Sequence, residues 1–522
     1  MNPTSTLADP TLVPLGPHSG PAPAVSDAVR DQISDLSQSI DAIRERLTEL
    51  AAAAGDGKHV LTRLDVFHGY MWIFVVAFIT SLFATPIMRR VAIHFGVVDR
   101  PSEARKIHRT PTAYLGGVAV YLGVFAAITF TYAAPFHGLI EFHPSANPAR
   151  GLPGGVPVSI LLGMTVIMLC GLIDDVMGID PRAKIAGQLF AAAALALEDV
   201  GVRVAAGLLV PLAKGVGIAT VNIKGFETIA FNIPLSWAGL PDVPIDVVYW
   251  VGTAVIAVFV IGACNASNLI DGLDGLLSGV TSIAAGGLLL IALALAVVDD
   301  GGRGIGPNLD APRIILCMGL LGACLGFLPH NFNPATIFLG DAGSLLLGYL
   351  TITIVLTLGS TGQTQLVVAG LIIYAIPIID TTLAIARRKI AGRKISDADD
   401  QHLHHMLKRA LGVKGAVFAL YGIGVAFAIM GVLLSEERGR VIYSLILVFA
   451  AFVGVTSFKI ARRGEIERQM RDAEERRKQA APPAPVSAPI PAPTPVSGPS
   501  TTVPASAPAP AAANPAVPAK PA

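Results

Sequence analysis

The fold class of this chain is decided by residues 248–298, VYWVGTAVIAVFVIGACNASNLIDGLDGLLSGVTSIAAGGLLLIALALAVV. Two apolar runs, 248–267 and 276–298, each have the roughly 20 residues that a helix needs to cross a bilayer. Over all 522 residues, 53% are hydrophobic and only 14% are charged, whereas soluble domains have about 25% charged residues. This composition excludes a soluble globular protein and predicts a polytopic membrane protein.

The same alternation of apolar runs and polar connections extends over residues 70–458, which we interpret as one multi-span domain. The pattern predicts an all-α membrane protein with about eleven spanning helices, at residues 70–88, 114–134, 156–173, 184–198, 248–267, 276–298, 312–328, 342–359, 366–387, 414–434 and 441–458. Residues 199–247 are too polar and too rich in Gly and Pro to span. Their alternating stretch ATVNIKGFETIAFNIPL (219–235) predicts a hairpin of strands.

The two ends of the chain differ in composition from this domain. Residues 1–69 start with a Pro-, Gly- and Ser-rich stretch typical of disorder, and apolar residues then recur at heptad spacing over 33–50. The heptads predict either a short coiled coil, which favours a homodimer, or a lone amphipathic helix. Charged residues 459–478 predict a helix on an anionic membrane surface or a solvated helix, and Pro/Ala-rich residues 479–522 predict a disordered tail.

The positive charges of the short loops predict the orientation in the membrane. Loops 89–113 and 388–413 each hold six Lys or Arg residues, whereas loops 135–155 and 299–311 hold one Arg each. Because positive loops stay in the cytoplasm, eleven spans place the N-terminus outside a bacterial inner membrane and the C-terminus inside. The balance of 38 Lys and Arg against 37 Asp and Glu gives no indication of a nucleic-acid partner.

Five polar motifs fall on the predicted cytoplasmic side, where ionisable groups at the ends of spans are costly unless they have a function. In DRPSEARKIHRTPTAYLGG (99–117), Lys106 and its basic neighbours could hold phosphates, or could simply anchor the next span. The pair Gly116 and Gly117 would let another helix or a substrate approach closely.

The second motif is GLIDDVMG (171–178), in which Asp174 and Asp175 end an apolar span and Lys184 opens the next. Adjacent carboxylates raise one another's proton affinity, so that one can act as a base while the other helps to hold a cation. A pair that merely marks the membrane interface is the weaker alternative, because Lys would serve better at that place.

The third and fourth motifs carry oxygen ligands suited to magnesium. In NASNLIDGLDGL (265–276), Asn265, Asn268, Asp271 and Asp274 follow one another at three-residue steps, which places them on or near one helix face. In FLGDAGS (338–344), Asp341 lies in a glycine-flanked break between two spans, where backbone amides can face an anion. Mg²⁺ takes one or two carboxylates together with phosphate oxygens, so this set predicts a magnesium site.

The fifth motif, DADDQHLHHML (397–407), contains His402, His404 and His405. A His-x-His-His run suggests zinc, but no cysteines are nearby and magnesium-type ligands are already present elsewhere. We therefore interpret the histidines as a pyrophosphate-binding group.

Taken in order, the segments RKIH with the following Gly pair, GLIDDVMG, NASNLIDGLDGL, FLGDAGS and DQHLHHML resemble the polyprenyl-phosphate N-acetylhexosamine-1-phosphate transferase family, over residues 70–460. The resemblance implies that the oxygen of a polyprenyl phosphate attacks the β-phosphorus of a UDP-N-acetylhexosamine. UMP is released, and the lipid-linked sugar begins cell-envelope polysaccharide synthesis. The HLHH loop looks like the branch that uses UDP-N-acetylglucosamine.

The resemblance also implies roles for individual residues. Mg²⁺, or Mn²⁺ in its place, would bind Asn268 and Asp341, and Asp174 would be the base or orienting group for the lipid phosphate, supported by Asp175. Substrate contacts are implied for a further set: Phe338 against uracil, Asp271 and Asp274 on the nucleotide side, Lys106, Lys184, His404 and His405 on the phosphates, and His402 in the same loop.

Three alternatives stay open at this point. The phospho-N-acetylmuramoyl-pentapeptide branch of the same family has three consecutive histidines in the loop, and Ala113, Tyr114 and Ala398 depart from the usual pattern at sugar or lipid contacts. A transporter with buried carboxylates would show inverted repeats, and no internal repeat is found in the sequence. A scaffolding role is favoured only by the heptads and the tails.

Overall fold

The computed structural model describes residues 62–99, 112–133, 139–142, 155–223, 226–233, 243–297, 309–360, 362–390, 392 and 402–436, and isolated residues between 40 and 48 and between 462 and 474. The predicted heptads are described only at such isolated residues. The predicted span 441–458, the tail 479–522 and Lys106 lie outside the described residues. The domain boundaries drawn from composition therefore stay predictions.

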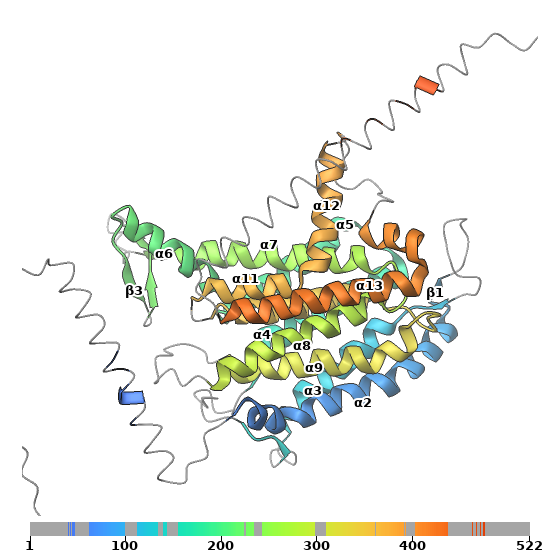
Figure 1. Ribbon diagram of the computed structural model, residues 1–522, viewed down its shortest axis with the longest axis horizontal. Coiled ribbons are helices and arrows are strands. Elements are labelled where there is room, and N and C mark those ends of the chain that lie inside the picture. Colours follow the sequence, from blue (N-terminus) through green and yellow to red (C-terminus); the bar gives the residue numbers. More distant parts are fainter. Residues whose placement is uncertain are drawn as a thin grey trace, which may run out of the picture. The chain divides into compact units, whose positions relative to one another are not determined.

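The described chain is built almost entirely of helices (Figure 1). They are α2 (Arg63–Phe95), α3 (Gly116–Tyr132), α4 (Val158–Met177), α5 (Pro181–Leu197), the short η2 (Val202–Ala205), α6 (Ala206–Gly215), α7 (Val247–Ile270), α8 (Leu276–Val297), α9 (Asp310–Asn331), α10 (Gly340–Thr357), α11 (Thr364–Ile373), α12 (Ala375–Ile390) and α13 (Leu403–Ser435). Seven of these helices are long and apolar enough to cross a membrane, or eight if the bent pair α11 and α12 forms one span.

The protein is thus a multi-pass, all-α membrane protein, but the predicted count of eleven spans is too high for the described residues. Spans 114–134 and 184–198 became α3 and α5, which have only 17 residues each. A helix of that length reaches about 26 Å, less than the roughly 30 Å of a hydrocarbon core. α3 starts two residues later than predicted, behind the strand residues Thr112–Ala113, whereas α5 starts three residues earlier than predicted, behind the capping residue Asp180.

The helices divide into an inner and an outer group. In α8, α9 and α10, between 67% and 89% of the most apolar window is buried, against 28% to 33% in α2, α4, α7 and α13. Because lipid tails solvate apolar side chains, the exposed apolar faces of the outer helices fit a membrane. In α10, 17 of the 18 residues are buried, and the exception is Asp341.

Three small antiparallel sheets complete the fold: β1 (Val98–Asp99) with β2 (Thr112–Ala113), β3 (Val221–Ile223) with β4 (Phe226–Thr228), and β5 (Ala230–Ile233) with β6 (Val243–Asp246). The predicted hairpin in 219–235 is confirmed by the β3–β4 pairing. Figure 1 shows β3 and α6 at one end of the bundle and β1 at the other.

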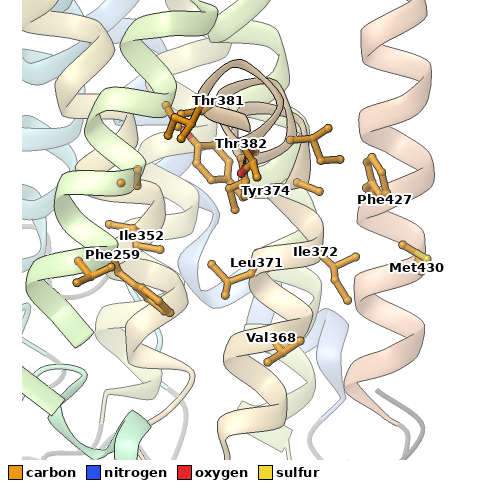
Figure 2. A pocket seen from close by; sticks show the side chains of 18 of the residues that line it. Phe259, Ile352, Val368, Leu371, Ile372, Tyr374, Thr381, Thr382, Phe427 and Met430 are labelled. Carbon is orange, nitrogen blue, oxygen red and sulfur yellow. Dashed lines mark hydrogen bonds between the residues drawn. The ribbon is translucent and has the colours of Figure 1, made fainter. Parts of the chain in front are cut away.

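The bend between α11 and α12 opens a cavity. These two helices meet at 81°, and the cavity beside the bend has a volume of about 740 Å³. Its walls come from α7, α10, α11, α12 and α13 and are almost wholly apolar; Figure 2 shows Phe259, Ile352, Leu371 and Phe427 among them. We refer to this space as the apolar cavity.

Candidate functional site

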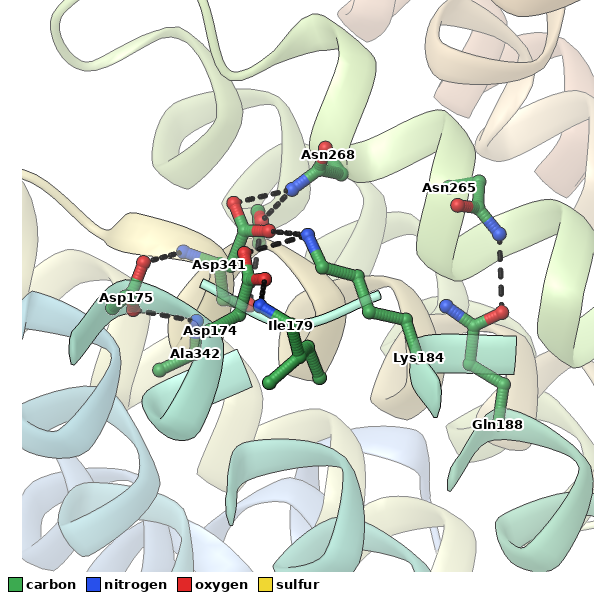
Figure 3. A network of polar contacts seen from close by, with 10 residues as sticks. Asp174, Asp175, Ile179, Lys184, Gln188, Asn265, Asn268, Asp341 and Ala342 are labelled. Carbon is green, nitrogen blue, oxygen red and sulfur yellow. Dashed lines mark hydrogen bonds and ion pairs between the residues drawn. The ribbon is translucent and has the colours of Figure 1, made fainter. Parts of the chain in front are cut away.

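Four helix ends meet at one end of the bundle and bring together polar residues that are far apart in sequence. The Lys184 ammonium, at the start of α5, lies 2.6 Å from Asp174 Oδ2 on α4 and 2.5 Å from Asp341 Oδ2 on α10 (Figure 3). Asn268, near the end of α7, donates from Nδ2 to Asp341 Oδ1 at 2.8 Å. We call these four residues the carboxylate–lysine cluster.

Further polar groups extend the cluster into the bundle. Asn268 Nδ2 also donates to Ser344 Oγ at 3.0 Å. One helical turn deeper on α5 and α7, Asn265 Nδ2 donates to Gln188 Oε1 at 3.1 Å and to the Ile261 carbonyl at 2.8 Å. The side chains of the cluster itself are 17% to 25% exposed where the ion pairs form, so a ligand can reach them.

Asp175 has a different task from its neighbour Asp174. Its Oδ1 and Oδ2 accept the backbone N–H groups of Asp341 (2.7 Å) and Ala342 (3.0 Å), so that α4 caps the first turn of α10. The residue that starts α10, Gly340, has a φ of 69°, a left-handed conformation that glycine adopts without strain. Asp175 thereby fixes the position of Asp341.

The glycine pair before α3 makes the second close approach to this region. The Gly116 and Gly117 amides donate to the carbonyls of Phe338 (2.9 Å) and Leu339 (2.8 Å). A Cβ atom on Gly117 would lie 2.1 Å from the Gly343 nitrogen, which leaves no room for a side chain. The expectation that these glycines admit another helix is confirmed, and the helix is α10.

A polar cavity of about 260 Å³ opens beside the carboxylate–lysine cluster. It is lined by Asp99, Tyr114, Asn268, Asp271, Gly272, Leu273, Asp274, Asn331, Phe338, Leu339, Gly340 and Asp341. Burial, reinforced by the charges of Asp341, Asp175 and Asp274, raises the pKa of Asp271 to about 8. The cavity thus concentrates carboxylates, and a cationic partner would relieve their repulsion.

Asp274, the second aspartate of the DGLDG segment, also bonds to the loop before Phe338. Asp274 is buried, and its Oδ2 accepts from Asn333 Nδ2 at 2.8 Å and from the Ala335 amide at 3.0 Å. It therefore shapes the loop that leads to Phe338 besides lining the cavity. Phe338 packs beside Tyr114, with ring centroids 5.9 Å apart.

The predicted histidines gather around an aspartate that the sequence analysis did not single out. Asp380 on α12 accepts at Oδ2 from His402 Nδ1 (3.2 Å) and His404 Nδ1 (2.9 Å). We call Asp380, His402 and His404 the histidine cluster. His405 stands beside it, with its ring centroid 4.3 Å from that of His404, and no bond to Asp380 is formed.

The structure thus places Asp174, Lys184, Asn268 and Asp341 in one cluster, Asp175 behind it, and Asp271, Asp274 and Phe338 around the adjoining cavity. Asp380 could have been found by one signal, since it is a lone carboxylate at the end of the apolar run IPIID within a predicted span. The partners of His402 and His404 required the fold.

Comparison with known proteins finds a matching family model and several similar enzymes. A family model described as "Glycosyl transferase family 4" matches residues 157–359, a range that contains every residue of the carboxylate–lysine cluster. A decaprenyl-phosphate N-acetylglucosaminephosphotransferase of Mycolicibacterium smegmatis is 32% identical over 406 residues, which cover 75% of this chain and 88% of the relative.

Two further relatives mark the range of similarity. A probable undecaprenyl-phosphate N-acetylglucosaminyl 1-phosphate transferase of Bacillus subtilis is 30% identical over 384 residues, covering 73% of this chain and 88% of the relative. A phospho-N-acetylmuramoyl-pentapeptide-transferase of Bacillus cytotoxicus is 28% identical over 371 residues, covering 68% and 95%. The N-acetylglucosamine relatives are thus the more similar of the two kinds.

Proposed function

Since the chain belongs to the polyprenyl-phosphate N-acetylhexosamine-1-phosphate transferase family, we propose that it transfers N-acetylglucosamine-1-phosphate from the UDP-sugar to a polyprenyl phosphate. The observation that carries this proposal is the carboxylate–lysine cluster beside a polar cavity, at the end of an apolar bundle. N-acetylglucosamine is preferred over the muramoyl-pentapeptide because relatives named for it are more similar to this chain.

The two cavities suit the two substrates. The polar cavity, with Phe338 and Tyr114 on its wall, offers rings against which a uracil base can stack and carboxylates for its polar groups. The apolar cavity of about 740 Å³ can bury isoprene units of the acceptor, at a gain of roughly 25 cal/mol per Å² of apolar surface relative to water. Lys184 then attracts the lipid phosphate to the end of the bundle.

The reaction exchanges one phosphoanhydride for another. An oxygen of the polyprenyl phosphate forms a bond to the β-phosphorus of the nucleotide sugar, and the bond from that phosphorus to the bridging oxygen breaks, so that UMP leaves with the electron pair. Asp174, held by the Ile179 amide and Lys184, accepts the remaining proton of the acceptor phosphate or orients it. Lys184 reduces the repulsion between the two phosphates as they meet.

The donor set of the site fits a magnesium ion. Asp341 and Asn268 offer a carboxylate and an amide oxygen beside the polar cavity, and Ser344 and Asp174 lie within the same network. Hard oxygen ligands of this kind suit Mg²⁺, or Mn²⁺ in its place, which leaves further positions for phosphate oxygens. Bound there, the ion would neutralise charge on the transferred phosphoryl group.

The proposal extends to the setting of the enzyme. We place the site at the cytoplasmic face, with the N-terminus outside and the C-terminus inside, because α3 and α13, which follow the two basic loops in sequence, begin beside the site, with Gly116 bonded to Phe338 and His404 against Gly272. The product would supply lipid-linked sugar for cell-envelope polysaccharides. A homodimer is proposed from the heptads in 33–50.

The test is transfer by the purified full-length chain in detergent, with UDP-N-acetylglucosamine, undecaprenyl phosphate and MgCl₂, followed by UMP release and mass spectrometry of the lipid. We expect UMP and lipid pyrophosphate product in equal amounts, both abolished by EDTA. UDP-N-acetylgalactosamine and UDP-N-acetylmuramoyl-pentapeptide run in parallel decide the sugar. Absence of UMP release with all three donors would refute the proposed function, and activity in EDTA would refute the metal site.

A further inference from the structure

Asp380 is a buried carboxylate with three partners and no role in the reaction described above. Its side chain is 1% exposed, although α12 leaves the bend beside the apolar cavity. Oδ1 accepts the backbone N–H of Leu403 at 2.7 Å, and Oδ2 accepts from the Nδ1 atoms of His402 and His404. A carboxylate so enclosed, with every bond directed at one short segment, fixes that segment.

The bond to Leu403 determines where α13 begins. The N-cap residue of α13 is His402, whose side chain makes no capping hydrogen bond. Asp380 supplies the missing acceptor from another helix, as Asp175 does for α10. The first turn of α13, which carries His404, is thereby held against α12.

The bonds to the imidazole rings determine which nitrogen is presented. A carboxylate only accepts, so the Nδ1 atom of His404 must be the donor to Asp380, and Nε2 points away from it. A Cβ atom built on Gly272 would lie 2.7 Å from that Nε2, which places the nitrogen against the Gly272 backbone. Gly272 lines the polar cavity, so His404 reaches the cavity wall from behind.

We propose that Asp380 is a positioning residue that acts through His404, holding this imidazole against Gly272 so that the wall of the polar cavity keeps the shape that receives the nucleotide sugar. The inference rests on the proposed function. Asp380 fixes the ring through Nδ1, and the Nε2 side of the ring lies against Gly272, whose neighbours Asp271 and Leu273 also line the cavity. Without the Asp380 carboxylate, the ring would lose its fixed orientation and this part of the cavity wall could move.

The same three residues form the group among the described residues whose donor atoms, all within 4.8 Å of one another, could hold a metal ion. Zinc sites take four protein ligands, or three with an open position for water. Here the three side chains are 1% to 6% exposed, and the two histidine contacts already have hydrogen-bond lengths. We therefore assign the cluster to hydrogen bonding, and metal content becomes part of the test.

The experiment compares D380N, D380E, H404Q and the double variant D380N/H404Q in the full-length enzyme, with wild-type transfer measured in the same preparations. We expect D380N to raise KM for UDP-N-acetylglucosamine about tenfold, with KM for undecaprenyl phosphate within about twofold of wild type. The double variant should match H404Q alone, because Asp380 acts through that ring. D380E, which keeps the charge, should recover part of the loss and remains informative if D380N does not fold.

The matched control is E198Q. Glu198 also caps a helix other than its own. It follows the last residue of α5, far from the cluster, and its Oε2 accepts from the Ser159 amide (3.1 Å) and hydroxyl (2.8 Å) at the start of α4. E198Q should lower thermal stability without changing either KM.

Three results would each overturn the inference. They are effects of D380N and H404Q that multiply in the double variant, an unchanged KM in D380N, and stoichiometric zinc that is lost in D380N. A wild-type enzyme without activity would instead refute the proposed function.

Discussion

The carboxylate–lysine cluster and the histidine cluster are both built from aspartates on helices that meet at one end of the bundle, yet they are arranged in opposite ways. In the first, a cation lies between two carboxylates that come from α4 and α10, and the side chains are 17% to 25% exposed. In the second, one carboxylate lies between two imidazoles, and the exposure does not exceed 6%.

The difference in exposure distinguishes a cluster whose side chains must change partners when a ligand binds from a cluster whose partners stay the same. Lys184 must release at least part of its hold on Asp341 when a phosphate or a magnesium ion arrives, and partial exposure makes that exchange possible. Asp380 has no such exchange to make, because its three partners belong to one segment of α13. We therefore expect substitutions in the first cluster to affect the chemical step and those in the second to affect donor binding.

The largest effect is expected for D341N. An asparagine side chain has nearly the volume of aspartate and can still accept from Asn268, but it lacks the charge that faces Lys184 and the proposed metal ion. The value of kcat should fall about 10³-fold, as it does when a group that stabilises transition-state charge is lost. Thermal unfolding in the same detergent is the control, and a well-folded variant with kcat within tenfold of wild type would contradict the role given to Asp341.

K184M should show the next largest effect and would sharpen the comparison most directly. Without the ammonium, Asp174 and Asp341 repel one another, and Lys184 no longer competes with the proposed ion for their oxygens. We expect kcat to fall about 100-fold while the magnesium concentration needed for half-maximal activity decreases. A magnesium requirement that increases would mean that Lys184 helps to hold the ion rather than competing with it.

D175N addresses the support of the first cluster. Both oxygens of Asp175 accept backbone N–H groups of α10, and the amide of an asparagine would turn a second donor towards one of them. Loss of such a bond typically costs about 1–3 kcal/mol, so both the melting temperature and kcat should fall, the latter about tenfold. Unchanged stability with a large loss of kcat would indicate direct contact with substrate instead.

The sequence singled out the residues of the first cluster but did not show how they are paired. The Asp pair, Lys184, Asn268 and Asp341 stand out because polar residues are rare in apolar runs, and this signal needs no fold. That Lys184 bridges two helices, while Asp175 caps a third, depends on helix packing over 157 to 167 residues of sequence. Long-range contacts of this kind leave no local pattern.

Sequence patterns overcounted the spans and did not single out Asp380. Hydropathy identified every long helix among the described residues but also accepted α3 and α5, which have only 17 residues each. Asp380 was not singled out because it is a lone acid inside the predicted span 366–387 and belongs to none of the five polar motifs. The role of Asp380 becomes apparent only from its bonds to His402 and His404 at the start of α13.

A smaller, pH-dependent effect is expected for D271N. An unfolded aspartate has a pKa near 3.9, whereas burial and the nearby charges raise the pKa of Asp271 to about 8 in the folded protein. Between these values the folded state binds more protons, so stability falls as the pH rises through this window. In magnesium-free buffer, the wild-type melting temperature should fall more steeply from pH 5 to pH 8.5 than that of D271N. Parallel curves for the two proteins would contradict the raised pKa.

The smallest effect is expected at the opposite end of the bundle, which serves as the reference for both clusters. Lys214 on α6 and Glu227 on β4 form an ion pair at 2.7 Å, and their side chains are 56% and 42% exposed. Exposed pairs contribute little because water and salt screen them and because two flexible side chains must be ordered. E227Q should therefore leave kcat, both KM values and the melting temperature unchanged within error. A change in either KM would show that the hairpin is coupled to substrate binding. The effects of substitutions in the two clusters could then not be ascribed to their own end of the bundle alone.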